Sequence, residues 1–388
     1  MALTILDRTP ADEGDPIDLQ LHQLGAAPAS LAPGLPWYTR AGIGWSAGAP
    51  PLLLLLLIGA ALGPGGLAVL TPNVLAAIDP AVPVALAVLG VHLSLHVDVD
   101  GSRGGIRLLA LAGVESLVTA ATVVIGLLIL LSPDLTSVPF HTWLIALAAG
   151  VCASMSAPAP PAAGASGRRH NVDLLIATVL GGALLAWVRE GSVRDSALML
   201  GQLTLLPLIV ALAAWLLIAP NTSEIEGRIF SLAALLLLGG LADFLSLSAL
   251  FSGLIAGWAW RVSGGAVRET MQRDIGYLQH PLLVLLLLVA GSRMTMSNAS
   301  LTLVVAYVLL RAAGKLTGGL LARRLWPQQV TSGFPLALLA PGAFGVAFAM
   351  STVRAAGPQA DPLLGAVVLG TIVSQILAAM TRGQEDAA

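Results

Sequence analysis

Lys315 is the only lysine among the 388 residues of this chain, and the other 18 basic residues are arginine. It lies in an apolar stretch, residues 298–326, that is typical of a membrane-spanning helix, 11 residues before Trp326. That separation is about 16 Å at 1.5 Å per residue, too long for easy snorkelling of the ammonium to the interface. Ionisable groups at such depth cost about 2.5–3.5 kcal/mol or more and are functional candidates. Lys315 and Arg311, one helical turn earlier, are therefore candidate site residues.

Glu115 is the acidic residue best placed to pair with Lys315. Glu115 stands 11 residues after Gly104, which lies at the cytoplasmic start of a second apolar stretch. Lys315 is likewise 11 residues from the cytoplasmic end of its own apolar stretch. A buried carboxylate or ammonium without a partner would lose its charge instead of staying ionised. We therefore predict a Glu115–Lys315 pair, which would act either as a structural clamp or as a proton-exchanging centre.

The other polar motifs point to less chemistry. His92 and His96 have the i, i+4 spacing of a metal-binding pair but lack further ligands, and Cys152 is the single cysteine, so we expect no metal site and no disulfide. Asp243 is expected to be an ordinary exposed carboxylate in a short turn. The sequence contains no phosphate-binding loop, nucleophile elbow or zinc-protease motif, so we expect neither an enzyme nor a cofactor.

The composition indicates an integral membrane protein. Apolar residues make up 56% of the chain and charged residues 10%, and the mean hydropathy is +0.87, whereas soluble domains carry about 25% charged residues. The expected surroundings are therefore a lipid bilayer, and the net charge of −2 argues against a nucleic-acid partner. Residues 1–48 are polar and lack the pattern of a signal peptide, so we expect a mostly disordered cytoplasmic segment.

From residue 50 onward the chain contains about twelve apolar segments, each roughly as long as a bilayer is thick. They cover residues 50–70, 81–99, 104–131, 139–160, 171–188, 195–218, 227–244, 247–262, 278–293, 298–325, 333–355 and 361–381. With the N-terminus inside, 13 of the 19 basic residues fall on the cytoplasmic side, and four fall on the opposite side, namely Arg189, Arg194, Arg293 and Arg354. This asymmetry follows the positive-inside rule. We predict a polytopic all-α membrane domain over residues 49–382, a short tail over 383–388 and two cytoplasmic termini.

Two segments cannot be continuous helices. The fourth contains three prolines between residues 158 and 161, which remove backbone donors, and the eleventh contains a Pro-Gly pair. Irregular backbone at membrane depth persists only where protein or a water-filled cavity satisfies its polar groups. The alternative is two proline-kinked helices in a passive bundle. The break residues predicted to frame a site are Ser154, Ser156, Ala157, Pro158, Pro341 and Gly342.

The two interrupted segments occupy corresponding places in the chain. Each is the middle of a unit of three segments. One unit comprises the third to fifth segments and the other comprises the tenth to twelfth, and the two units enter the membrane from opposite sides. Such inverted repeats with paired broken helices are the best sequence pointer to the substrate site of a transporter. We therefore predict inverted repeats with broken helices 4 and 11.

These stretches together resemble the membrane domain of the monovalent cation/proton antiporters, the sodium/hydrogen exchanger family, over roughly residues 50–381. The resemblance is carried by residues 57–64, 89–98, 241–257, 280–291 and Arg311-Ala-Ala-Gly-Lys315. It implies a core domain with two crossed broken helices, a dimerising domain, elevator-like movement between them, and a homodimer.

The chain departs from this family in the segment over residues 171–188. The family's ion-binding carboxylate belongs midway along this helix, where the positions expected to be acidic are Gly181 and Gly182. A hard cation needs oxygen ligands, preferably charged ones. Some members carry a glutamate on the third helix, so the resemblance makes Glu115 the expected replacement as proton carrier, with Ser154 and Ser156 nearby.

The sequence as a whole predicts a secondary transporter of the bacterial inner membrane that exchanges a monovalent cation, such as sodium or potassium, for protons. Two alternatives are left open. The chain is a transport-inactive or sensory homologue of the fold, as the missing carboxylate would favour, or it transports a small anion drawn to Lys315 and to half-helix N-termini.

Overall fold

The computed structural model describes residues 52–96, 103–132, 139–156, 164–190, 193–220, 223–294, 298–326 and 341–385, all within a unit that spans residues 44–388. The predicted N-terminal segment over residues 1–48 lies outside the described residues, as do Ala157 and Pro158 of the first predicted break. Apart from one isolated β-bridge, every named element in the described residues is a helix. This confirms the all-α class.

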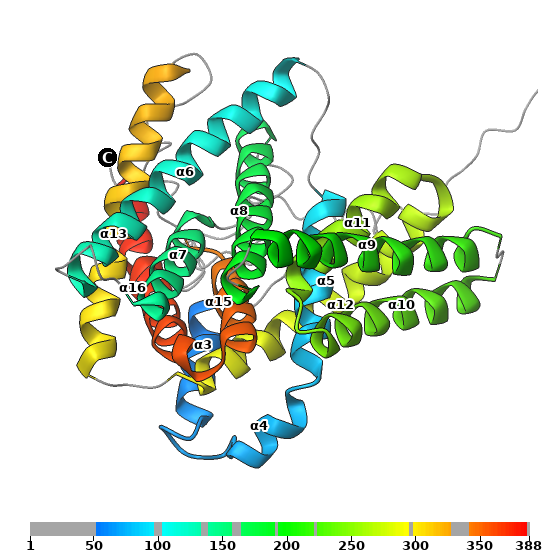
Figure 1. Cartoon of the computed structure of the whole chain (residues 1–388), viewed down its shortest axis with the longest axis horizontal. Coiled ribbons are helices and arrows are strands. Elements are labelled where there is room, and N and C mark those ends of the chain that lie inside the picture. Colours follow the sequence, from blue (N-terminus) through cyan, green and yellow to red (C-terminus); the bar gives the residue numbers. More distant parts are fainter. Residues whose placement is uncertain are drawn as a thin grey trace, which may run out of the picture. The chain divides into compact units, whose positions relative to one another are not determined.

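The helices follow one another along the chain (Figure 1). They are α3 (Leu52–Leu62), α4 (Pro72–Ile78), α5 (Ala81–His96), α6 (Arg103–Leu131), α7 (Phe140–Ser154), α8 (Gly164–Glu190), α9 (Val193–Ile218), α10 (Glu224–Phe244), α11 (Ala249–Ser263), α12 (Gly265–Ser292), α13 (Asn298–Leu325), α15 (Ala343–Ala356), the 3₁₀ turn η3 (Gly357–Ala360) and α16 (Asp361–Glu385).

Within the described residues, five helices are long and apolar enough to cross a membrane, or six if α4 and α5, bent by 47° at their junction, form one span. Several shorter apolar helices accompany them, among them α3, α7 and α15. The chain is therefore a helical, multi-pass membrane protein. The total of about twelve spans and the inverted repeats stay predictions.

Three predicted segment boundaries outside the site are corrected by the structure. The segment expected over residues 50–70 is helical only to Leu62, because a turn rich in glycine follows, and Thr71 then caps the separate short helix α4. The segment expected to begin at residue 278 begins at Gly265, because the polar first turns of α12 broke the apolar pattern. Helix α16 runs to Glu385, beyond the segment end predicted at residue 381.

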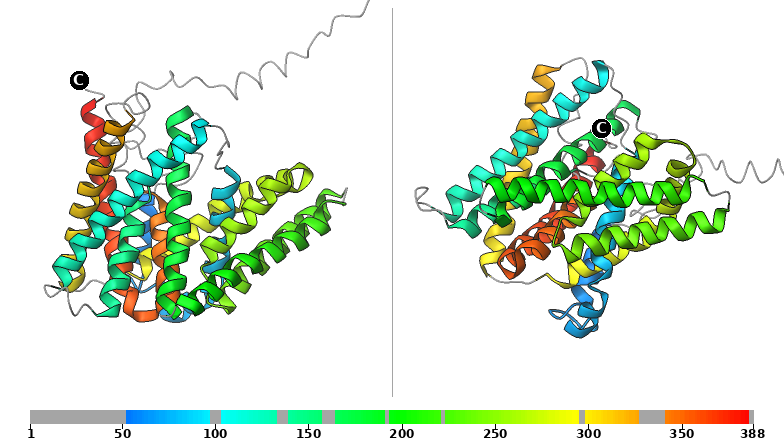
Figure 2. Two further views of the ribbon diagram at one scale, coloured as in Figure 1. Left: turned by 45° about the horizontal axis from the view of Figure 1, so that its top comes forward. Right: turned by 45° about the vertical axis from the view of Figure 1, so that its right-hand side comes forward.

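The described helices pack in two groups (Figure 2). The first helix group consists of α6, α7, α8, α13, α15 and α16. The second helix group consists of α3, α5, α10, α11 and α12. Helix α9 packs on α10 and α11 of this group and also contacts α8 of the first group. Packing within each group is more extensive than packing between them. Between the groups, α15 contacts α5, α11 and α12, α8 contacts α5 and α11, and α16 contacts α3 and α12.

Glycines bring the central helices of the first group together. Helix α13 carries Gly314 and Gly318, four residues apart, against α6, where a Cβ at Gly314 would lie 3.0 Å from Thr119 Cα and one at Gly318 would lie 3.0 Å from the Glu115 carbonyl oxygen. Small residues at this spacing let two membrane helices approach closely. Because Lys315 follows Gly314 directly, this contact also sets the distance between Lys315 and α6.

Candidate functional site

The two predicted breaks meet in the first helix group. Helix α7 ends at Ser154, Met155 is extended, and Ser156 forms an isolated antiparallel β-bridge with Pro341. Gly342, also extended, is the N-cap residue of α15, which begins at Ala343. The structure thus brings together Ser154, Ser156, Pro341 and Gly342, which sequence reasoning had placed in two separate segments.

The ammonium of Lys315 lies at this meeting point. Its Nζ donates to Glu115 Oε1 over 2.7 Å, to Ser156 Oγ over 2.9 Å and to the Ser154 carbonyl oxygen. Asp173 Oδ2 lies 3.4 Å from the same nitrogen. The exposed fraction of Lys315 is 0% and that of Glu115 is 1%. The predicted Glu115–Lys315 contact is therefore present and fully buried.

The end of α7 presents carbonyl groups that have no partner within the helix to Lys315 and Arg311 of α13. The Ser154 carbonyl accepts from Lys315, and the Met155 carbonyl accepts from Arg311 Nη2 over 3.2 Å. The last carbonyls of a helix have no partner within the helix and carry a partial negative charge, so they favour nearby cations. Because α7 stops inside the helix group, its carbonyls can act as ligands for these cations.

Asp173 is the site residue that sequence reasoning missed. It lies on α8 with 2% of its surface exposed, and Ser156 Oγ donates to its Oδ2 over 3.4 Å. Its Oδ1 is buried and accepts no hydrogen bond from the part of the chain that the structure describes. The helix had been expected to begin at residue 171, which would put Asp173 at the interface, but α8 begins at Gly164. The available signal was an aspartate between Val172 and Leu174.

Gly181 and Gly182 do not provide this carboxylate. A Cβ at Gly181 would collide with the Phe348 ring of α15, and one at Gly182 would collide with the Phe251 ring of α11. These positions are packed contacts between helices and leave no space for an acidic side chain. The carboxylate of this helix that faces Lys315 is Asp173, which the sequence analysis did not single out.

Four ionisable side chains thus share the site, and we call them the buried cluster: Glu115, Asp173, Arg311 and Lys315. Two acids and two bases give no formal net charge. Removing one partner from a buried ion pair typically costs about 3–5 kcal/mol, because the other charge is left uncompensated. Thr119 adds to the site by donating from Oγ1 to the Glu115 carbonyl over 2.9 Å and to Glu115 Oε1 over 3.4 Å.

The buried cluster combines groups that can bind a proton with oxygen atoms that can bind a cation. The oxygens around Lys315 Nζ are carboxylate, hydroxyl and backbone carbonyl oxygens, which are also the ligands of hard metal cations. The carboxyls and the amine can each take or release a proton. The arrangement can therefore hold one positive charge either as an ammonium or as a bound cation.

Comparison with known proteins supports the fold. No protein-family model matches the sequence, and no curated protein matches it. Among solved structures, the sodium proton antiporter MjNhaP1 from Methanocaldococcus jannaschii, determined at pH 8, is similar with a TM-score of 0.62 and 17% sequence identity. The match covers 88% of this chain and 95% of that chain. At this identity the likeness concerns the fold, which is the one that the sequence resemblance implied.

Proposed function

We propose that this chain is a secondary active transporter of the cation:proton antiporter type, which works by alternating access and has no enzymatic activity. The observation that supports this most is the buried cluster, where Lys315 is bound by Glu115, Ser156 and the Ser154 carbonyl beside the meeting of two interrupted helices. Its fold, similar to that of a sodium proton antiporter, is consistent with this reading.

Exchange follows from competition for the same oxygens. A monovalent cation such as sodium or potassium would take the place of the Lys315 ammonium when that group releases a proton, so the charge of the cluster stays the same. The Asp173 Oδ1 atom, which accepts no hydrogen bond from the described residues, is available as a further cation ligand or as a protonation site. A cation and a proton would then occupy the site in turn and not together.

The two alternative functions have less support. A transport-inactive homologue was favoured by the missing carboxylate, and Asp173 now supplies one beside Lys315. A small anion would need an available cation, but the Lys315 ammonium is already held by Glu115 and Ser156. By the positive-inside pattern we further propose an inner-membrane location with both termini cytoplasmic, and by resemblance a homodimer.

Proteoliposomes that carry a pH gradient test this function. We expect addition of sodium or potassium to dissipate the gradient in the wild type, and Glu115→Gln and Asp173→Asn to abolish the response. Glu269→Gln, which removes an exposed carboxylate of α12, is the matched control and should behave as wild type. No response to any monovalent cation in the wild type would refute antiport. A response that depends only on the anion of the added salt would favour the alternative of an anion transporter.

A further inference from the structure

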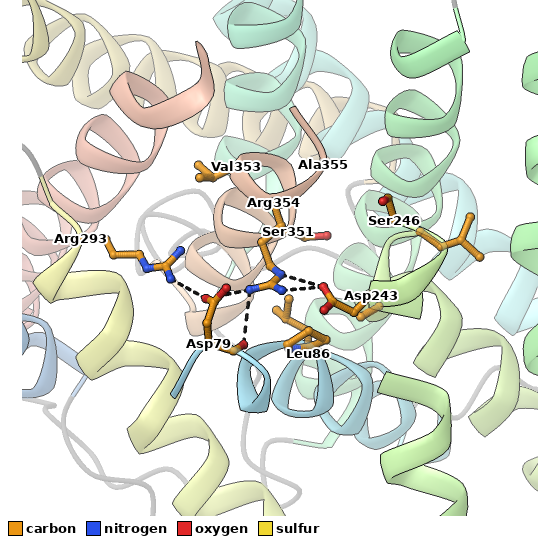
Figure 3. A pocket seen from close by; sticks show the side chains of 12 residues that line it. Asp79, Leu86, Asp243, Ser246, Arg293, Ser351, Val353, Arg354 and Ala355 are labelled. Carbon is orange, nitrogen blue, oxygen red and sulfur yellow. Dashed lines mark hydrogen bonds and ion pairs between the residues drawn. The ribbon is translucent and has the colours of Figure 1, made fainter. Parts of the chain in front are cut away.

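A second group of charged residues lies where α15 meets the second helix group, and we call it the Arg354 cluster: Asp79, Asp243, Arg293 and Arg354 (Figure 3). Arg354 Nη1 lies 2.8 Å from Asp79 Oδ1, and Arg354 Nη2 lies 2.5 Å from Asp243 Oδ1. Arg354 Nη1 also donates to the Asp79 carbonyl over 3.4 Å. Asp243, expected to be an ordinary turn carboxylate, is therefore a partner in a tertiary ion pair.

Arg354 connects the two helix groups. It lies in the last turn of α15, in the first group, while Asp79 lies at the α4–α5 junction and Asp243 near the end of α10, both on the side of the second group. Figure 3 shows the Arg354 side chain between these two carboxylates. The neighbouring pair of Arg293 with Asp79 stays within the second group. Arg354 therefore forms ion pairs across the boundary, whereas the ion pair of Arg293 with the same Asp79 does not cross it.

A second contact strengthens the same connection. Ser351, one turn before Arg354 on α15, places its Oγ 3.3 Å from the Oγ of Ser248, the residue that caps α11. Both side chains are buried. At its C-terminal end, α15 thus contacts the second group through two polar residues, Ser351 and Arg354. At its N-terminal end, α15 begins just after the β-bridge between Ser156 and Pro341.

Helix α15 is short and well packed, so its two ends move together. It has 14 residues, about 21 Å at 1.5 Å per residue. Its residues from Phe344 to Thr352 are buried. A displacement of the break at Lys315 relative to the second group would therefore also displace Arg354 from Asp79 and Asp243.

A cavity of about 230 Å³ lies beside these residues, lined by the Arg354 cluster and by Leu86, Ser246 and Ser351. The exposed fraction of the side chain is 19% for Arg354 and 42% for Asp243, so these ion pairs are only partly buried. The charges of the cluster are balanced and face one another, which is not the arrangement of a site for a charged ligand. Pairs of this kind are individually weak and can break and form again.

We propose that Arg354 is a latch that holds α15 against the second helix group, and that this latch must open for the ion pathway to reach the side of the membrane opposite the arginine-rich side. The charge asymmetry of the sequence places Arg293 and Arg354 on that side. The role in transport rests on the proposed antiport. The latch itself is a property of the two helix groups and is tested without transport.

Disulfide trapping measures the latch directly. In a Cys152→Ala background, which removes the single native cysteine, Ser248→Cys and Ser351→Cys place two thiols where two hydroxyls now lie 3.3 Å apart. We expect rapid cross-linking by a mild oxidant in the purified full chain. Adding Arg354→Gln should slow cross-linking about two- to fivefold, the range for a partly exposed ion pair, and Arg354→Lys should slow it less.

Arg228→Gln is the matched control, because it removes an exposed ion pair with Glu224 that lies within α10 of the second group, and its loss should leave the cross-linking rate unchanged. Thermal unfolding of each variant checks that all are folded. The latch is overturned if the parent double-cysteine variant does not cross-link, or if Arg354→Gln cross-links as fast as the parent.

The transport arm uses the same double-cysteine protein in proteoliposomes. We expect exchange to stop on oxidation and to return on reduction. Equal exchange in the oxidised and reduced protein would overturn the need for the latch to open. If the reduced parent shows no exchange at all, the proposed antiport fails, and the cross-linking rates still decide whether Arg354 holds α15.

Discussion

The buried cluster and the Arg354 cluster have the same formal composition, two acids and two bases, but they differ in burial and in the helices that they join. Every member of the buried cluster lies on α6, α8 or α13 of the first helix group and is almost fully buried. The Arg354 cluster is partly exposed and joins the first group to the second. Helix α15 extends between them, from the break beside Lys315 to Arg354.

The difference shows how burial decides what a set of charges can do. A buried charge left without its partner is costly, so the charges around Lys315 must change together, as in the exchange of a proton for a cation. Partly exposed pairs contribute only about 0–1 kcal/mol each, so the pairs of Arg354 can separate and reform during a conformational cycle. The buried cluster is therefore suited to carry an ion, and the Arg354 cluster is suited to control a movement.

The largest expected effect comes from removing the cation of the buried cluster. Lys315→Met leaves Glu115 with no ammonium partner, and we expect a loss of about 3–5 kcal/mol in the free energy of unfolding together with loss of exchange. Thermal unfolding in detergent and the proteoliposome assay measure the two effects. Unchanged stability would contradict the burial of a charged pair at this position.

The double variant Glu115→Gln/Lys315→Met separates a clamp from a proton-exchanging centre. Removing both charges should restore most of the stability lost in Lys315→Met, because replacing a buried pair by neutral groups is often close to neutral. We expect exchange to stay absent. Recovery of exchange together with stability would mean that the pair serves as a structural clamp only.

Asp173→Asn is expected to affect function more than stability. Asp173 lies 3.4 Å from Lys315 Nζ, farther than Glu115 at 2.7 Å, so its loss weakens the cluster less. It removes a carboxyl that can bind a proton or a cation. We expect exchange to fall to background at every pH tested while the melting temperature changes little. A pH profile of exchange identical to that of the wild type would exclude Asp173 from the site.

The smallest effect on stability is expected at the partly exposed cluster. Arg354→Gln removes two partly exposed pairs and should cost at most about 2 kcal/mol, and the loss should shrink at high salt because exposed pairs are screened. Chemical unfolding at low and high ionic strength measures it. A loss as large as that in Lys315→Met would erase the proposed difference between the two clusters.

The sequence alone predicted the parts of the site that depend on single residues of unusual type or on chain breaks. The rarity and depth of Lys315 singled it out, and equal spacing from the membrane edge predicted its contact with Glu115. Proline indicated both interruptions, since a residue without an N–H cannot continue a helix. These signals are local in the sequence. The folded structure brings the residues that carry them into contact.

Other parts depended on information that the local sequence does not hold. Asp173 was missed because the polar start of α8, residues 164–170, does not look like a membrane helix, so the predicted helix began seven residues late. Arg354 and Asp243 are 111 residues apart, and two partly exposed charges give no periodic pattern that would pair them. Such contacts follow from how the helix groups pack.

The most direct test of exchange at Lys315 is proton release on cation binding, measured with a pH-sensitive dye on purified protein in weakly buffered detergent solution. We expect sodium or potassium chloride to release protons from the wild type and from the Glu269→Gln control. Glu115→Gln and Asp173→Asn should release none, while a chloride salt of a large organic cation should give no signal with any variant. Absence of release from the wild type, or equal release from the two site variants, would contradict a shared cation and proton site in the buried cluster.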